Sequence, residues 1–288
     1  MFCSRKSIAY HPNYICNIVK NLCFIILYSV SIASVAEQTI EEIIVTSDFR
    51  DLTILETATS LTVLDDTKIR QRNAVHLEQL LNVAPNVNFS SGASRGKFIQ
   101  IRGIGERSQF IEPLNPSVGI LVDGIDFTGI AGAATTMDTK KVEILRGPQG
   151  TLYGANALAG LINITSNQPT GRTEGNISLD VGRFDARTVS AAVGGSLSEE
   201  TNYRLAVQHH RSDGYISNDF LNREDTNNID ELSLRSIFDW RAGDDLSLKL
   251  TLFHVDADNG YDSFSLDNTR RTLSDNPGHD RQKSSAIA

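Results

Sequence analysis

Residues 142–169 read VEILRGPQGTLYGANALAGLINITSNQP. Two short apolar runs, Val142–Leu145 and Leu161–Ile164, predict strands at its ends. Glu143 and Arg146 lie at its entrance. Glycine reaches positive φ and lets backbones approach closely. Four glycines separate the two runs, at Gly147, Gly150, Gly154 and Gly160. They predict a compact, packed connection between two strands.

Two general interpretations of this stretch compete. A phosphate-binding loop is disfavoured, because the stretch has neither a Gly-Lys-Ser/Thr ending nor the G-x-G-x-x-G spacing. A glycine-rich turn within an ordinary soluble domain stays open on these residues alone.

Composition limits the classes of function. The chain has 288 residues, of which 40% are hydrophobic and 22% charged, with a net charge of −8 and a pI near 5.3. This length fits one or two folded domains. Nucleic-acid binding requires a basic face for phosphate contacts, so the acidic balance argues against a nucleic-acid partner.

Residues 1–36 are predicted to be a signal peptide. Arg5, Lys6 and Lys20 supply positive charge, residues 22–35 form an apolar core, and Ser34-Val35-Ala36 offers a cleavage site after Ala36. A permanent anchor helix is the alternative, but the core is shorter than the ~20 residues that a span requires. All three cysteines lie in this segment, so the rest of the chain offers no disulfide or thiolate metal site.

Short elements are predicted between residues 60 and 124. Leu77, Leu80 and Leu81 have the spacing of one apolar helix face, and Pro85 ends that helix. His76, at its start, is expected to lie on the surface. The predicted elements are a strand at 60–64, helices at 65–72 and 75–82, strands at 98–102 and 118–122, and a tight turn at Asp123-Gly124.

After Gly171 the apolar residues alternate with polar ones. The sets that share a face include Ile177, Leu179 and Val181; Val189, Ala191, Val193 and Leu197; Tyr203, Leu205 and Val207; Leu232, Leu234, Phe238 and Trp240; and Leu246, Leu248, Leu250 and Leu252. Outer-membrane barrels use such apolar-out, polar-in strands. A soluble sandwich alternates as well. Connections 198–202 and 242–245 are short, whereas 213–228 and the tail from Asp256 are long and polar, which favours the barrel.

Residues 142–169 resemble the signature near the end of the plug domain of TonB-dependent outer-membrane receptors. LEQLLNVAPNVNFSS at 77–91, IRG at 101–103 and LVDG at 121–124 resemble further plug motifs in the expected order. The resemblance implies an α+β plug domain, a small mixed sheet with short helices, at residues 48–170. Antiparallel β-strands of an incomplete transmembrane β-barrel are then expected at 171–288. The plug motif residues are Gly103, Asp123, Gly124, Gly147, Gly150, Tyr153, Gly154 and Gly160.

Residues 40–46 read IEEIIVT and predict a short extended segment. Such a segment is suited to pairing with the sheet edge of another protein, although an ordinary first strand has the same pattern. The resemblance implies that residues 37–47 contain a TonB box. TonB, working with ExbB and ExbD, would bind it at Glu42, Ile43, Ile44, Val45 and Thr46.

The resemblance also implies roles for other residues. Plug–barrel contacts are expected at Arg102, Glu143 and Arg146, and ligand contacts in a long loop at Arg107, Gln109, Phe110 and Asn115. The implied protein is a receptor in the outer membrane of a Gram-negative bacterium, in contact with its lipid. It would take up a scarce nutrient such as a ferric siderophore, without a cofactor.

Two further expectations concern the extent of the chain and catalysis. Roughly five strands are expected, whereas plugged transporters have about 22, so a piece of a longer receptor or a truncated product is expected. The alternative is a truncated periplasmic plug-like binding module without transport activity. An enzyme is not expected, since no nucleophile set stands out. The histidines likewise show no metal-like grouping, at His76, His209, His210, His254 and His279.

Overall fold

The computed structural model describes residues 44–45, 52–53, 59–91, 95–107, 115–130, 134–243, 245–262, 265–267 and 269–288. The helices are α2 (Asp66–Gln71), α3 (Glu78–Leu81) and α4 (Gly150–Tyr153). The first ten strands are β1 (Ile44–Val45), β2 (Leu52–Thr53), β3 (Ser60–Asp65), β4 (Val87–Ser91), β5 (Gly96–Ile101), β6 (Ile104–Gly105), β7 (Val118–Val122), β8 (Ile125–Asp126), β9 (Thr139–Arg146) and β10 (Gly160–Ser166). The remaining strands are β11 (Glu174–Val181), β12 (Arg187–Ser196), β13 (Thr201–Ser212), β14 (Ser217–Asn218), β15 (Ile229–Arg241), β16 (Ser247–Tyr261), β17 (Arg271–Thr272) and β18 (Gly278–Ile287).

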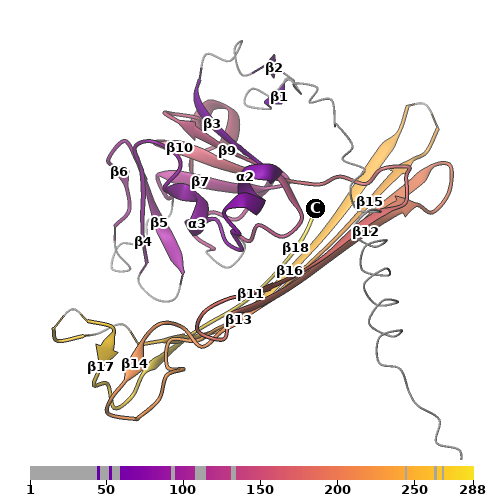
Figure 1. Cartoon of the computed structure of the whole chain (residues 1–288). Coiled ribbons are helices and arrows are strands. Elements are labelled where there is room, and N and C mark those ends of the chain that lie inside the picture. The colour runs from indigo at the N-terminus through magenta and orange to yellow at the C-terminus, as the bar shows by residue number, and fades with distance from the viewer. Residues whose placement is uncertain are drawn as a thin grey trace, which may run out of the picture. The chain divides into compact units, whose positions relative to one another are not determined.

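The first half of the described chain is built on a five-stranded mixed sheet in the order β3-β9-β10-β7-β8 (Figure 1). β10 lies in the middle, antiparallel to β9 and parallel to β7, with Ile162 opposite both Ile144 and Ile120. These three isoleucines are buried. β9 and β10 contain the two strands predicted at the ends of residues 142–169, so that prediction is confirmed. A separate three-stranded sheet, β4-β5-β6, follows α3 in the sequence.

Two short helices cover part of the apolar core. Asp65 caps α2, because its carboxylate accepts a hydrogen bond from the Lys68 N–H at 2.8 Å. Leu77, Leu80 and Leu81 are all buried, as their spacing predicts. α3 is shorter than the predicted helix at 75–82, since residues 75–77 instead hydrogen-bond with residues 134–136. His76 is only 1% exposed, so its expected surface position was wrong.

The tight turn predicted at Asp123-Gly124 is confirmed. Their φ values are 51° and 84°, the left-handed conformation that a two-residue hairpin turn of type I′ requires at both positions. The turn joins β7 to β8, with Val122 paired with Ile125. Several short elements were not predicted, among them β4 and α4, which contain no apolar alternation or helical periodicity that would have indicated them.

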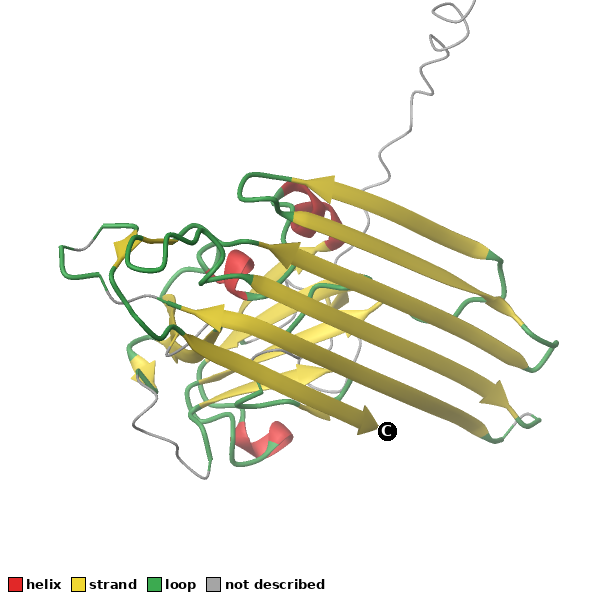
Figure 2. Ribbon diagram, turned by 90° about the horizontal axis from the view of Figure 1, so that it is seen from below, coloured by secondary structure: helices red, strands yellow, loops and turns green. Residues whose placement is uncertain are grey.

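The second half forms a six-stranded antiparallel sheet, β11-β12-β13-β15-β16-β18, in which the strands follow one another in chain order (Figure 2). β18 at one edge lies within the stretch expected to be a polar tail, so about five strands was one too few. Its sequence, GHDRQKSSAI, has no apolar face that alternation could reveal. Pairing with β16, from Leu252–Ile287 to Tyr261–Gly278, positions it.

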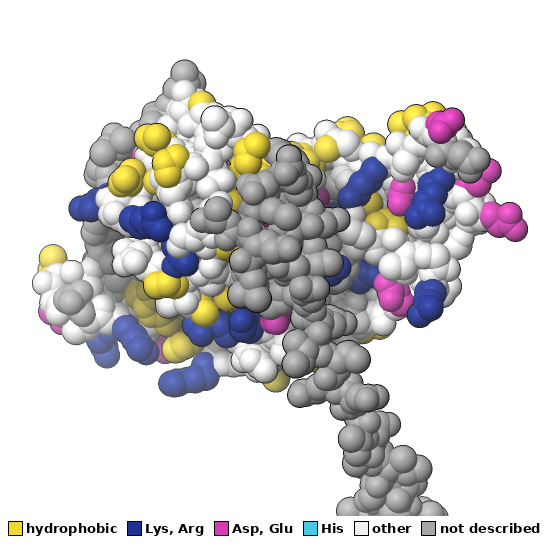
Figure 3. All heavy atoms as spheres, turned by 90° about the horizontal axis from the view of Figure 1, so that it is seen from above, with side chains coloured by type: hydrophobic (Ala, Val, Ile, Leu, Met, Phe, Trp, Pro, Cys, Tyr) yellow, Lys and Arg dark blue, Asp and Glu magenta, His cyan; other side chains and the backbone are white. Residues whose placement is uncertain are grey.

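The two faces of this sheet differ as predicted. One face, called here the outward face, exposes large apolar side chains such as Ile177, Leu205 and Leu248. The opposite face buries polar side chains, among them Arg204, Gln208, Ser233 and Arg235. Figure 3 shows acidic and basic side chains interspersed among hydrophobic ones on the side that it presents. The apolar-out, polar-in prediction is therefore confirmed.

Apolar side chains of both sheets meet in one core. Ala192, Ala206, Phe253 and Val255 of the six-stranded sheet belong to the same buried cluster as Ile120, Ile144 and Ile162 of the five-stranded sheet. The rings of Phe127 and Phe253 pack edge to face, with centroids 5.1 Å apart. Among the described helices, none has the length and apolar character needed to cross a membrane.

Candidate functional site

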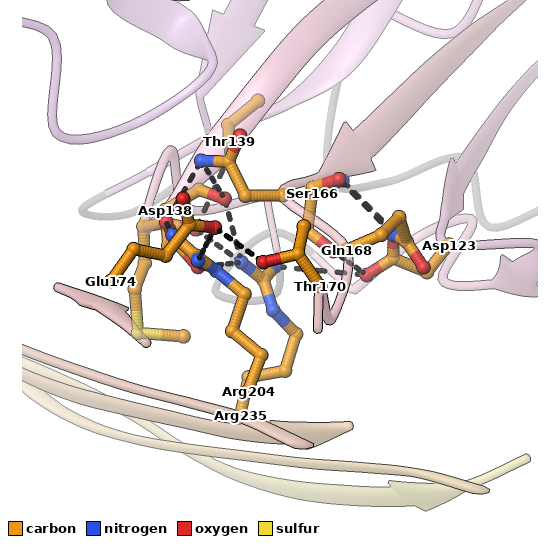
Figure 4. A network of polar contacts seen from close by, with 11 residues as sticks. Asp123, Asp138, Thr139, Ser166, Gln168, Thr170, Glu174, Arg204 and Arg235 are labelled. Atoms are coloured by element: carbon orange, nitrogen blue, oxygen red, sulfur yellow. Dashed lines mark hydrogen bonds and ion pairs between the residues drawn. The ribbon is translucent and has the colours of Figure 1, made fainter. Parts of the chain in front are cut away.

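A group of charged side chains, buried except for Glu174, lies between the five-stranded sheet and the six-stranded sheet (Figure 4). This group, called here the Asp138 cluster, consists of Asp123, Asp138, Glu174, Arg204 and Arg235. The first two come from the turns before β8 and β9, and the two arginines project from β13 and β15. The cluster therefore joins segments that are far apart in the sequence.

Asp138 is the centre of the cluster. Its carboxylate accepts two parallel hydrogen bonds from Arg204, both at 2.6 Å, and a third from the Asn167 side chain at 2.8 Å. Its carbonyl oxygen accepts another from Arg235 at 3.0 Å. Its φ of 47° is left-handed, a conformation that aspartate and asparagine tolerate better than most residues.

Arg235 and Arg204 extend the cluster in two directions. Arg235 donates to the Met137 carbonyl oxygen at 2.7 Å and lies 3.8 Å from the Asp123 carboxylate. Arg204 also donates to Glu174 at 3.1 Å, on the first strand after the five-stranded sheet. The cluster thus fixes the point where the chain passes from β10 into β11.

Burial decides how strong these contacts are. The side chains of Asp138, Arg204 and Arg235 are between 2% and 8% exposed. A buried charge without its partner is costly, whereas a complete pair is only weakly stabilising relative to an apolar replacement. The cluster therefore specifies one position of the five-stranded sheet against the six-stranded sheet and opposes partial separation of the two.

A second group, the Arg95 cluster, consists of Glu78, Arg95, Glu231 and Asn259. Arg95 donates two hydrogen bonds to Glu231 of β15, at 2.7 and 2.6 Å, and one to Glu78 of α3 at 2.6 Å. Asn259 of β16 donates to Glu231 at 2.8 Å. Arg95 is 5% exposed, so this bridge is also buried.

The Arg95 cluster predicts a dependence of stability on pH. Burial raises the pKa of the Glu78 carboxyl, but Arg95, His76 and the Gly96 N–H together lower that pKa below its ordinary value of 4.5. A lowered pKa means that Glu78 stabilises the fold above the unfolded value and loses this contribution as pH falls through the folded one. We expect the urea midpoint of the wild-type protein to fall below about pH 4.5 more steeply than that of Glu78→Gln. Parallel curves for the two proteins would contradict the assignment.

The three residues predicted to contact the barrel lie within the five-stranded sheet or beside it. Glu143, fully buried, contacts Lys141 and the side chain of Asn163. Arg146 donates to the carbonyl oxygens of Pro85 and Leu61. Arg102 is exposed, in a turn with φ of 56°. Their role as barrel contacts stays a prediction.

The predicted motif residues occupy turns and close contacts. Gly103, Gly147 and Gly154 have positive φ, which glycine adopts without strain. Gly150 and Tyr153 are the first and last residues of α4. Asp123 has a second role that was not predicted, since its carboxylate accepts hydrogen bonds from the Ser166 N–H and hydroxyl at 2.9 and 2.8 Å.

The predicted ligand and TonB contacts are only partly within the described residues. Arg107 and Asn115 are exposed, and the Arg107 carbonyl oxygen accepts a hydrogen bond from Ser90 at 3.0 Å. Gln109 and Phe110 lie outside the described residues, as do Glu42, Ile43 and Thr46. Ile44 and Val45 form β1, paired antiparallel with Thr53 and Leu52.

Of the residues in the two clusters, only Asp123 was predicted from the sequence. The others are Glu78, Arg95, Asp138, Glu174, Arg204, Glu231, Arg235 and Asn259. One signal was present for Arg204 and Arg235. Both occupy the polar positions of alternating strands, where a lone arginine between apolar neighbours requires a buried partner. In the part of the chain that the structure describes, no group of three or more His, Cys, Asp or Glu side chains is placed to hold a metal ion.

Comparisons with known proteins agree with this architecture. Residues 53–161 match the family model described as TonB-dependent Receptor Plug Domain. The pesticin receptor of Yersinia pestis is 34% identical over 128 residues, which cover 44% of this chain and 19% of that receptor. The vitamin B12 transporter BtuB of Vibrio vulnificus is 22% identical over 232 residues, or 78% of this chain and 36% of the transporter.

A solved structure shows the same fold. The ferric yersiniabactin uptake receptor FyuA from Yersinia pestis superposes with a TM-score of 0.71 at 22% identity, covering 80% of this chain and 37% of FyuA. The chain thus spans between 19% and 37% of the lengths of these three relatives. The chain therefore contains, at residues 53–161, a plug domain that matches the plug domain of TonB-dependent receptors, followed by an open antiparallel sheet.

Proposed function

We propose that this protein serves in the energy-coupled uptake of a scarce nutrient across the outer membrane of a Gram-negative bacterium. A ferric siderophore is the favoured ligand. The name of one relative supports this choice, since FyuA is a ferric yersiniabactin uptake receptor. BtuB, named for the transport of vitamin B12, supports only the broader class of scarce nutrients. The apolar outward face of the six-stranded sheet supports a position in lipid rather than in the periplasm.

The Asp138 cluster is the observation that carries the proposal. A transporter of this kind must hold a plug firmly in a pore and still let it yield. The cluster seats the plug on the wall strands through directional, buried ion pairs. These ion pairs contribute little net stability once water can reach the charges. A pulling force on the chain can therefore separate the plug from the strands, whereas thermal motion alone does not.

The proposed mechanism follows the order of the chain. Ligand binds near Arg107 and Asn115. The TonB box at residues 37–47 is then engaged from the periplasm by TonB, which ExbB and ExbD energise. Residues 48–170 act as the plug and 171–288 as wall strands, after removal of a signal peptide at residues 1–36. Each residue here acts by binding or positioning, and the proposal assigns no catalytic step.

A panel of uptake measurements tests the proposed function. A strain that lacks the receptor is complemented with the complete reading frame and supplied with labelled ferric siderophores, vitamin B12 or oligosaccharides. We expect uptake of one ferric chelate that disappears when TonB is deleted. Uptake that persists without TonB would overturn the proposal.

The TonB-box assignment predicts the effect of Ile44→Pro. Proline removes the backbone N–H that strand pairing with TonB requires. We expect TonB-dependent uptake to fall by at least about tenfold, the effect of some 1.4 kcal/mol, while ligand affinity at the cell surface stays unchanged. Ile44→Val, which keeps the N–H, is the matched control. Normal uptake by the proline variant would contradict the assignment of residues 37–47 as a TonB box.

A further inference from the structure

The outward face carries a pair of arginines at its end beside the β11–β12 turn. Arg187 of β12 and Arg211 of β13 are directly opposite each other in the strand register. Both are exposed on the outward face, beside the β11–β12 turn. Directly opposed like charges on one sheet face destabilise the pairing, with Cβ atoms ~4.5–5.5 Å apart. An anion between the two guanidinium groups would remove this repulsion.

The neighbouring carboxylates do not neutralise the pair fully. Asp185 accepts from Arg187 at 2.5 Å, but both partners are about half exposed or more, so this ion pair is weak. Asp230, opposite Arg211 on its other side, contacts His209 at 2.8 Å. The Arg211 side chain makes no hydrogen bond or ion pair with any residue that the structure describes. Arg183, at the same turn, lies over the Phe184 ring at 5.4 Å.

An apolar trough lies below the arginines on the same face. Its volume is about 780 Å³, and its outward lining includes Ile177, Ala191, Val193, Leu205, Val207 and Leu234. Ala191 is flanked in register by Ile177 and Val207, so its small side chain leaves the depression between two larger ones. The trough begins four residues along β12 from Arg187 and four along β13 from Arg211. The trough can therefore accommodate an apolar chain, while the two arginines can bind an anionic group attached to the end of that chain.

We infer that Arg187 and Arg211, with the trough below them, bind one acylated, phosphorylated glycolipid of the outer leaflet. This rests on the proposed outer-membrane position. The phosphate monoester accepts charge-assisted hydrogen bonds from the two guanidinium groups, which suit phosphate geometry. One acyl chain lies in the trough between Ile177 and Val207. Elsewhere on the outward face, Lys283 and Arg281 each have a carboxylate partner at 2.8 Å, Asp256 and Asp258 respectively. Arg211 has no such partner among the described residues.

The test measures glycolipid retained by the receptor made from its complete reading frame. Purified receptor is compared by native mass spectrometry with the double variant Arg187→Gln/Arg211→Gln and with Ala191→Phe, which fills the trough. We expect both variants to retain at least about tenfold less phosphorylated glycolipid, the effect of losing one or two charge-assisted hydrogen bonds or the acyl contact. Arg281→Gln is the control and should retain the wild-type amount.

A second measurement separates the possible sources of phosphate. Delipidated receptor is heated with diphosphorylated lipid A, its dephosphorylated form or inorganic phosphate. We expect only the first to raise the unfolding temperature, and only with both arginines present. Equal retention by all variants, or an equal shift with inorganic phosphate, would overturn the inference. Membrane fractionation tests the proposed function separately. Absence of the protein from the outer membrane would contradict the proposed function, whereas lipid binding is still measured on the purified protein.

Discussion

Replacing Asp138 with asparagine is expected to unseat the plug. The substitution keeps the shape and the left-handed backbone but removes the charge that Arg204 and Arg235 face from 2.6 and 3.9 Å. Leaving a buried charge unpaired costs about 3–5 kcal/mol. For a protein in the outer membrane, as proposed, we therefore expect cells that carry Asp138→Asn to become sensitive to a large antibiotic that intact outer membranes exclude. We also expect the purified protein to lose protection of residues 134–170 from protease.

A matched control is available on the surface. Asp225 pairs with Arg223 at 2.8 Å, and both side chains are about half exposed. Such a pair contributes about 0–1 kcal/mol, so Asp225→Asn should leave antibiotic exclusion and protease protection unchanged. The role assigned to the Asp138 cluster is wrong if the two variants behave alike.

The second large effect is expected at Gly160, the first residue of β10. A Cβ atom at this position would lie 2.4 Å from the Leu145 carbonyl oxygen and 2.6 Å from Cδ1 of Ile101. The oxygen belongs to the neighbouring strand and cannot move without breaking the ladder between β9 and β10. We expect Gly160→Ala to destabilise the plug by about 1–3 kcal/mol or more, the cost of overpacking a core, measured as the urea midpoint for loss of protease protection.

Gly150, in the same glycine-rich stretch, gives the comparison. A Cβ atom there meets nothing within 4 Å, and the residue begins α4 with an ordinary φ. Alanine is a better helix former than glycine, so Gly150→Ala should leave the midpoint unchanged or raise it slightly. A midpoint for Gly160→Ala as high as that for Gly150→Ala would show that close packing at Gly160 is not required.

The strands of the plug were predictable because local pattern and tertiary role agree in them. Val118–Val122 was predicted as a strand and is β7, since a run of apolar residues bounded by turn signals suits a strand buried on both faces. Asp123-Gly124 was predictable because few residues adopt positive φ at two successive positions. The alternation in β13, β15 and β16 was visible because one face of those strands is apolar.

β18 and the short α3 were not predictable in the same way. β18 has no apolar periodicity, and its conformation depends on the backbone of β16. Residues 75–77 have the pattern of a helix, but hydrogen bonds with residues 134–136 hold them outside it. In both cases a partner distant in the sequence outweighs local preference.

The sequence by itself determined the family motifs, the order of plug and wall strands, and the special backbone positions of the glycines in residues 142–169. Each of these features depends on residues that are close together in the sequence. Only the tertiary structure decided which charges hold the plug. Asp138 and Arg204 are 66 residues apart, and Arg95 and Glu231 are 136 apart. A charged side chain carries no local sign of its distant partner, so burial and pairing emerge only when the two sheets meet.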